Sequence, residues 1–99
     1  MTINISKQQI AEVCEKNRIR KLSLFGSILR EDFKNDSDID VLVEFEEGNG
    51  PGYFGLARMA RDISNIFEGR KVDIRTPMEL SRYFRNEVLS SAEIQYEKG

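Results

Sequence analysis

The sequence predicts a single α/β domain over residues 1–99, with a mixed, mainly antiparallel sheet that carries helices on one face and the functional site on the other. Helical and strand patterns alternate along the chain, and no repeat, low-complexity run or linker interrupts them. A chain of 99 residues has room for one hydrophobic core and one site. The pattern alone therefore predicts a small α/β sandwich.

Composition and charge exclude several classes of function. The formal net charge is -2, so we expect no direct binding of a nucleic-acid polymer. The chain has no histidine and a single cysteine, Cys14, which excludes a Cys/His zinc site and any Ser-His or Cys-His catalytic pair. We expect Cys14 to be a small buried apolar residue. The chain shows no apolar leader or membrane-spanning run, which predicts a cytoplasmic protein without a membrane partner.

The first third of the chain predicts a helix, a strand and a second, short helix. Ser6 and Gln9 have the spacing of a capping box, so a helix is expected to begin at Lys7. Residues 21–25 alternate apolar and polar side chains, which indicates a strand. A short helix is then expected near Ser27.

The clearest strand is predicted over residues 38–45, where every second side chain is apolar. Its apolar face consists of Ile39, Val41, Val43 and Phe45. After a loop rich in glycine, a helix is predicted over residues 53–67, with one apolar face against the sheet. That face consists of Tyr53, Leu56, Ala60, Ile63 and Phe67.

The last part of the chain predicts a strand, a helix and a short extended segment. Residues 71–75 alternate in the manner of a strand. Thr76 and Glu79 have capping-box spacing around a proline, so a helix is expected to follow and to run to about Leu89. A short extended segment is expected at residues 94–96.

Three carboxylates are expected on one face of the sheet. Asp38 and Asp40 are two residues apart in a strand, so they project to the same side, and Asp73 has the same phase in a later strand. Close carboxylates repel one another, and hard divalent cations relieve that repulsion. If the two strands are neighbours, the three residues predict a site for two Mg²⁺ ions, with Mn²⁺ as an alternative.

A phosphate-binding turn is expected beside these carboxylates. Gly26 follows an apolar strand, and Ser27 has the chemistry of a helix cap. The first turn of a helix leaves backbone N–H groups without partners, and glycine lets a phosphate approach them closely. Each feature alone is more often structural, since a Gly-Ser pair is commonly a simple turn. The combined spacing favours phosphoryl or nucleotidyl transfer.

In this combination the sequence resembles the polymerase-beta-like nucleotidyltransferase superfamily, and most of all its minimal nucleotidyltransferases, the MNT proteins of toxin-antitoxin pairs. The resemblance implies that Gly26 and Ser27 bind the triphosphate of ATP. It implies that Asp38 and Asp40 bind the two metal ions, and that Asp73 binds one metal and the attacking hydroxyl.

Arg30 matches an arginine that commonly follows the Gly-Ser turn in that family and is a candidate ATP ligand. A surface ion pair with Asp32 or Glu31 is the alternative for this residue. Leu29 and Glu31 depart from the small residues usual at their positions in the family. The aromatic residues Tyr53, Phe54 and Phe67 are interpreted as core residues rather than base-stacking ones.

The family resemblance implies an enzyme that transfers AMP from ATP to a hydroxyl of a partner HEPN ribonuclease toxin, with tyrosine as the expected acceptor. The chain would then be the antitoxin of a type VII-like toxin-antitoxin pair. One alternative is an antitoxin or nucleotide sensor that acts by binding alone. Another is a small-molecule nucleotidyltransferase, which is disfavoured because 99 residues leave no second domain to enclose a small acceptor.

Overall fold

A computed structural model describes residues 5–29, 38–46 and 53–98 of the chain. Helices and strands alternate along it, together with two short 3-10 helices, η1 and η2. The elements are α1 (Lys7–Lys16), β1 (Ile19–Phe25), η1 (Gly26–Leu29), β2 (Ile39–Phe45), α2 (Tyr53–Ile66), β3 (Val72–Arg75), η2 (Pro77–Glu79), α3 (Arg85–Ser91) and β4 (Glu93–Glu97).

The four strands form one mixed sheet in the order β3-β2-β1-β4. Strand β1 pairs in antiparallel fashion with both β2 and β4, whereas β2 and β3 are parallel. The predicted α/β fold with a mixed, mainly antiparallel sheet is therefore confirmed. The extended segment expected near the C-terminus is β4, an edge strand of this sheet.

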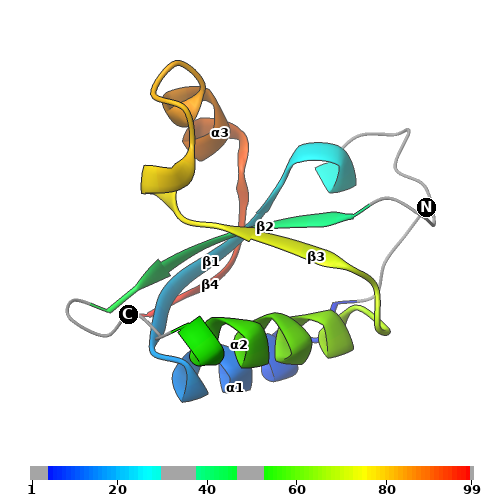
Figure 1. The fold of residues 1–99 in the computed structure, drawn as a ribbon. Coiled ribbons are helices and arrows are strands. Elements are labelled where there is room, and N and C mark those ends of the chain that lie inside the picture. The colour runs from blue at the N-terminus through cyan, green and yellow to red at the C-terminus, as the bar shows by residue number, and fades with distance from the viewer. Residues whose placement is uncertain (1–4, 30–37, 47–52, 99) are drawn as a thin grey trace.

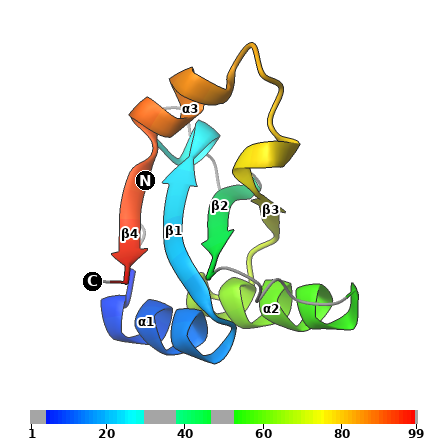
Figure 2. The same cartoon turned by 90° about the vertical axis from the view of Figure 1, so that its left-hand side faces the viewer.

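Helices α1 and α2 cover one face of the sheet (Figure 1). Figure 2 shows α1 beneath β1 and β4, and α2 beneath β2 and β3. As predicted, α1 begins at Lys7, where the Ser6 hydroxyl oxygen accepts a hydrogen bond of 3.2 Å from the backbone N–H of Gln9. We call α1 and α2 the helix layer.

The hydrophobic core lies between the helix layer and the sheet. Its buried residues are Ile10, Cys14, Ile19, Leu22, Leu24, Ile39, Val41, Val43, Met59, Ile63, Ile66 and Phe67. Burial raises the pKa of the Cys14 thiol to about 12, with a smaller contribution from Glu15, so this thiol is neutral and apolar in character, as expected. Leu56 was predicted to face the core but is 44% exposed, and Met59 occupies the core instead.

Residues 76–92, which we call the arm, leave β3 and return to β4 on the side of the sheet away from the helix layer (Figure 1). The prediction of a single helix from Pro77 to about Leu89 is wrong, because the arm contains η2, an irregular turn and α3. The Arg85 guanidinium donates to the carbonyl oxygens of Pro77 at 2.8 Å and Leu80 at 3.1 Å. These carbonyls are thereby satisfied without a continuous helix, and the backbone at Leu80 is extended.

The predicted cap at the start of the arm is present. The side chain of Glu79 accepts a hydrogen bond of 3.2 Å from the backbone N–H of Thr76. None of the helices in the described ranges has the length and apolar character needed to cross a membrane.

Candidate functional site

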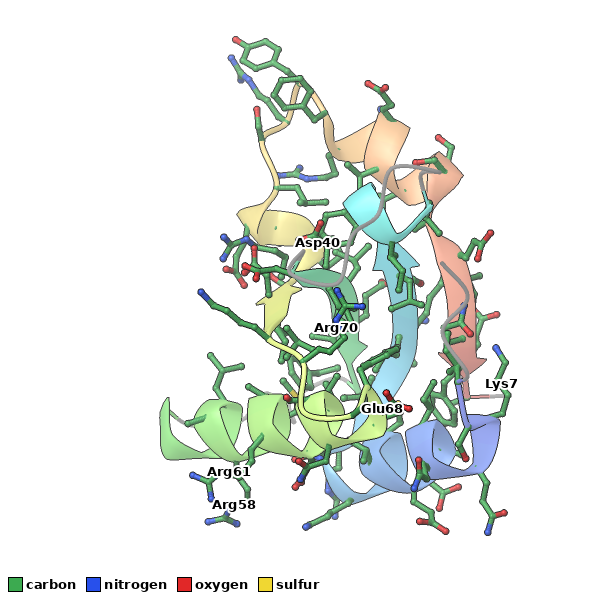
Figure 3. All side chains as sticks on the ribbon, turned by 90° about the vertical axis from the view of Figure 1, so that its right-hand side faces the viewer. Lys7, Asp40, Arg58, Arg61, Glu68 and Arg70 are labelled. Atoms are coloured by element: carbon green, nitrogen blue, oxygen red, sulfur yellow. The ribbon has the colours of Figure 1, made fainter. Side chains whose placement is uncertain are left out.

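Asp40 and Asp73 face each other across two neighbouring parallel strands. They are register partners in the β2–β3 pair, so both side chains project from the same face of the sheet. Figure 3 shows Asp40 on the side of the arm, whereas Arg58 and Arg61 project from α2 away from the sheet. The sequence predicted the common phase of the two aspartates, and the register now places them side by side on adjacent strands.

Gly26 lies against Asp40 at the end of β1. Phe25, the residue before it, is the register partner of Asp40 in the β1–β2 pair. A Cβ atom at position 26 would overlap Asp40 Oδ2 and would lie 3.1 Å from Asp40 Cγ. The φ angle of Gly26 is +73°, a conformation that side-chain-bearing residues rarely adopt. Glycine is therefore required here both by the backbone turn and by the position of the Asp40 carboxylate.

Asp38 lies just before β2 and is more exposed than Asp40. Its Oδ2 atom is 3.9 Å from Nζ of Lys71, and its side chain is 47% exposed. The backbone N–H of Ile39 donates to the carbonyl oxygen of Lys71 at 2.9 Å, which holds the starts of β2 and β3 together. Asp38 is thus at the edge of the site and is held by an ion pair with a lysine.

Asp73 also has a basic partner. Oδ2 of Asp73 is 3.3 Å from Nη2 of Arg75, two residues along the same strand. The two side chains are 38% and 47% exposed, so water screens this ion pair. Lys71 and Arg75 were not assigned roles from the sequence, although the i,i+2 spacing of Asp73 and Arg75 in a strand could have indicated their contact.

The three predicted carboxylates are only partly brought together. Among the described residues, no group of three or more acidic, histidine or cysteine side chains is close enough to hold a metal ion. Asp40 and Asp73 nevertheless supply carboxylate oxygens from directly opposed positions, which is the donor chemistry that Mg²⁺ prefers. The Asp38 carboxylate would join these two if its side chain turned away from Lys71.

The side chains next to the site on the β1–β2 pair are buried and leave no opening into the sheet. Ser23 and Leu42 are register partners, and each is 3% exposed. Leu42 lies on the same face as Asp40, two residues further along β2. A ligand at the site would therefore lie above the strand ends, where Gly26, Asp40 and Asp73 meet, rather than enter the sheet.

The remaining predicted site residues are less completely described. The backbone of Ser27 belongs to η1, the short helix expected there, but its side chain is not among those described. Arg30 lies outside the described residues. The structure also places Phe84 and Glu87 of the arm close to Gly26, a proximity that the sequence pattern did not indicate.

One protein-family model covers most of the chain. Residues 8–99 match the family model described as Polymerase beta, Nucleotidyltransferase. A relative from Methanocaldococcus jannaschii named "Putative protein adenylyltransferase MJ0435" is 33% identical over 92 residues. That match covers 93% of this chain and 96% of the relative.

Solved structures share the fold. A chain in a toxin-antitoxin structure with AMP-PNP matches with a TM-score of 0.71 and 17% identity, over 95% of this chain and 75% of the other. A chain in the structure of a tri-AMPylated Shewanella oneidensis HEPN toxin in complex with an MNT antitoxin matches with a TM-score of 0.63 and 17% identity. That second match covers 93% of this chain and 70% of the other.

Proposed function

The chain belongs to the polymerase beta nucleotidyltransferase family, and we propose that it transfers AMP from ATP to a hydroxyl group of a partner HEPN toxin. The observation that carries this proposal is the direct opposition of Asp40 and Asp73, with Gly26 packed against Asp40. The relative named as a protein adenylyltransferase supports AMP as the transferred group. The shared fold with a chain from a complex of an AMPylated HEPN toxin supports the choice of acceptor.

The transfer requires one bond to form and one to break. The acceptor oxygen bonds to the α-phosphorus of ATP, the bond from that phosphorus to the bridging oxygen breaks, and pyrophosphate leaves. We assign the backbone N–H groups at Gly26 and Ser27 to the triphosphate. Asp73 accepts the proton of the attacking hydroxyl, and tyrosine is the acceptor residue that we expect.

Mg²⁺ fits the donor set of this site. Asp38, Asp40 and Asp73 would hold two ions, which supply positive charge to the phosphate oxygens when bound. To hold these ions, the Asp38 carboxylate would turn from Lys71 and the Asp73 carboxylate from Arg75. Breaking either ion pair would cost little free energy, because both pairs are partly exposed to water.

Transfer of label tests the proposal directly. ATP labelled at the α-phosphate is incubated with Mg²⁺, the chain and a candidate HEPN partner protein, and we expect label on that protein. Asp40→Asn and Asp73→Asn should each lower the rate by roughly a thousandfold or more while the domain stays folded. Glu93→Gln removes an exposed carboxylate of β4 and should leave the rate unchanged.

Two outcomes would contradict the proposal. Stoichiometric binding of the HEPN protein without label would support an antitoxin that acts by binding alone. An Asp73→Asn variant that labels its partner at the native rate would remove Asp73 from the reaction.

A further inference from the structure

A pocket of about 330 Å³ lies between the end of β1 and α3, next to the candidate site. It is lined by Phe25, Gly26, Phe84, Glu87, Val88 and Ser91. Its volume is at the lower end of the range for small-molecule pockets, which suits one ring system rather than a whole nucleotide. Gly26 is shared, because it lines this pocket and also contacts the Asp40 carboxylate.

We propose that this pocket binds the nucleobase of the donor nucleotide, with Phe84 stacking on the base and Glu87 accepting a hydrogen bond from its exocyclic amino group. The inference rests on the proposed function, because it takes the triphosphate to lie at the Gly26 turn. It adds a base-binding subsite from the arm, with Phe84 as a stacking residue and Glu87 as a specificity residue, which the sequence did not indicate.

Packing within the chain does not account for the position of Phe84. Its side chain is 60% exposed, although it forms part of the pocket wall. Its backbone is fixed, since the N–H of Phe84 donates to the carbonyl oxygen of Ser81 at 2.9 Å and its own carbonyl oxygen accepts from the N–H of Val88 at 2.9 Å. An exposed aromatic ring on an ordered backbone, beside the turn to which we assign the triphosphate, offers a stacking surface for a base.

Glu87 gives the pocket a hydrogen-bond acceptor. With the other residues that the structure describes, its carboxylate forms no ion pair. A negative charge in the pocket disfavours phosphate as the occupant and favours a neutral group that donates hydrogen bonds. The 6-amino group of adenine is such a donor. The Ser91 hydroxyl already donates to the backbone carbonyl oxygen of Glu87 at 2.9 Å, so Glu87 is the better candidate for reading the base.

Calorimetric titration with two nucleotides tests the inference. The ligands are ATP and purine riboside triphosphate, which is ATP without the 6-amino group, each with Mg²⁺ held constant. Wild type should bind ATP more tightly, by roughly fivefold to tenfold, because only ATP offers the hydrogen bond to Glu87. Glu87→Ala should weaken ATP binding by that factor and leave the binding of purine riboside triphosphate unchanged.

Phe84→Ala should weaken the binding of both nucleotides by roughly fivefold to a hundredfold, because stacking does not depend on the amino group. Asn86→Ala, on the same helix but outside the pocket lining, is the matched control and should bind both nucleotides as wild type does. Far-UV circular dichroism of each variant should match wild type, because the three side chains are exposed.

Unchanged ATP affinity in Phe84→Ala would overturn the inference and leave the pocket to another occupant, such as the acceptor side chain. Equal loss of affinity for both nucleotides in Glu87→Ala would overturn the assignment of Glu87 to the amino group. Absence of binding of either nucleotide to wild type would instead contradict the proposed function itself, and the base pocket with it.

Discussion

The helix layer and the arm lie on opposite sides of the same sheet and use apolar residues in opposite ways (Figure 1). Ile10, Met59 and Phe67 of the helix side are at most 1% exposed. Met78 and Tyr83 of the arm are each 79% exposed. Within residues 53–98, neither η2 nor α3 contains a buried residue. Stability is therefore concentrated on the helix side, while the arm leaves large apolar side chains exposed.

The two regions meet at the candidate site. Strands β1, β2 and β3 bury one face against the helix layer, and their opposite face carries Asp40 and Asp73. The arm supplies Phe84 and Glu87 to the pocket that adjoins Gly26. The well-packed sheet thus fixes the carboxylates, and the more exposed arm forms one wall of the adjacent pocket.

The largest effect on stability should come from the helix side. Phe67→Ala removes a side chain that is 1% exposed and should cost about 3–5 kcal/mol of unfolding free energy. Tyr83→Ala removes a side chain of similar size and should cost less than about 0.5 kcal/mol, since Tyr83 is 79% exposed and its ring lies beside the exposed Arg82 side chain.

Urea unfolding of both variants measures the difference. Phe67→Leu, with an expected cost of about 1 kcal/mol, keeps the comparison measurable if the alanine variant does not fold. Equal costs for Phe67→Ala and Tyr83→Ala would break the contrast between the two regions and would show that the arm contributes as much to folding as the core does.

An intermediate effect is expected at the boundary between the regions. Gly26→Ala combines the strain of a positive φ angle with overlap of the new Cβ atom and Asp40, and should cost about 2–3 kcal/mol. Gly69→Ala is the matched control, because Gly69 has a φ angle of +81° and its Cβ would meet nothing within 4 Å. The control should cost only about 1 kcal/mol.

A double-mutant cycle tests whether the additional destabilisation by Gly26→Ala comes from overlap with the Asp40 side chain. Asp40→Ala removes the overlapping carboxylate, so Gly26→Ala in that background should cost about as much as Gly69→Ala. Thermal or urea unfolding gives the four free energies. Strict additivity would show that the carboxylate moves aside freely, and the glycine would then be required by the turn alone.

The same contact explains why part of the site could not be predicted from the sequence. The period of two in residues 38–45 and 71–75 was enough to place Asp40 and Asp73 on one face. The contact of Gly26 with Asp40 depends on the pairing of Phe25 with Asp40, which is a matter of strand register. Register is decided by the packing of whole strands and is not visible in either segment alone.

The arm was predicted less well than the helix layer for a related reason. Periodicity identified α1 and α2 because most of the described residues on their predicted apolar faces pack into the core. Leu56 is exposed, and the side chains of Tyr53 and Phe54 are not among those described. The arm has no buried face to create such a period. Its path depends on hydrogen bonds from the Arg85 side chain to carbonyl oxygens five and eight residues earlier, and local helix propensity does not reveal them.

The smallest effect concerns Arg75, which lies on β3 next to the site. Arg75→Gln removes the ion pair with Asp73 and should cost less than about 1 kcal/mol of stability, because both side chains are partly exposed.

The same change removes a positive charge that competes with metal for Asp73. Mn²⁺ or Mg²⁺ should therefore bind a few-fold more tightly in the presence of ATP, by roughly the strength of a screened ion pair. Arg82→Gln, which alters an exposed arginine of the arm, should leave metal affinity unchanged. Calorimetric titration of metal into both variants measures these affinities. The increase in metal affinity in Arg75→Gln should be smaller at high salt, because salt screens the charge of Arg75 in wild type. Weaker metal binding in Arg75→Gln would reverse the assignment: Arg75 would then hold the Asp73 carboxylate in the orientation that metal requires.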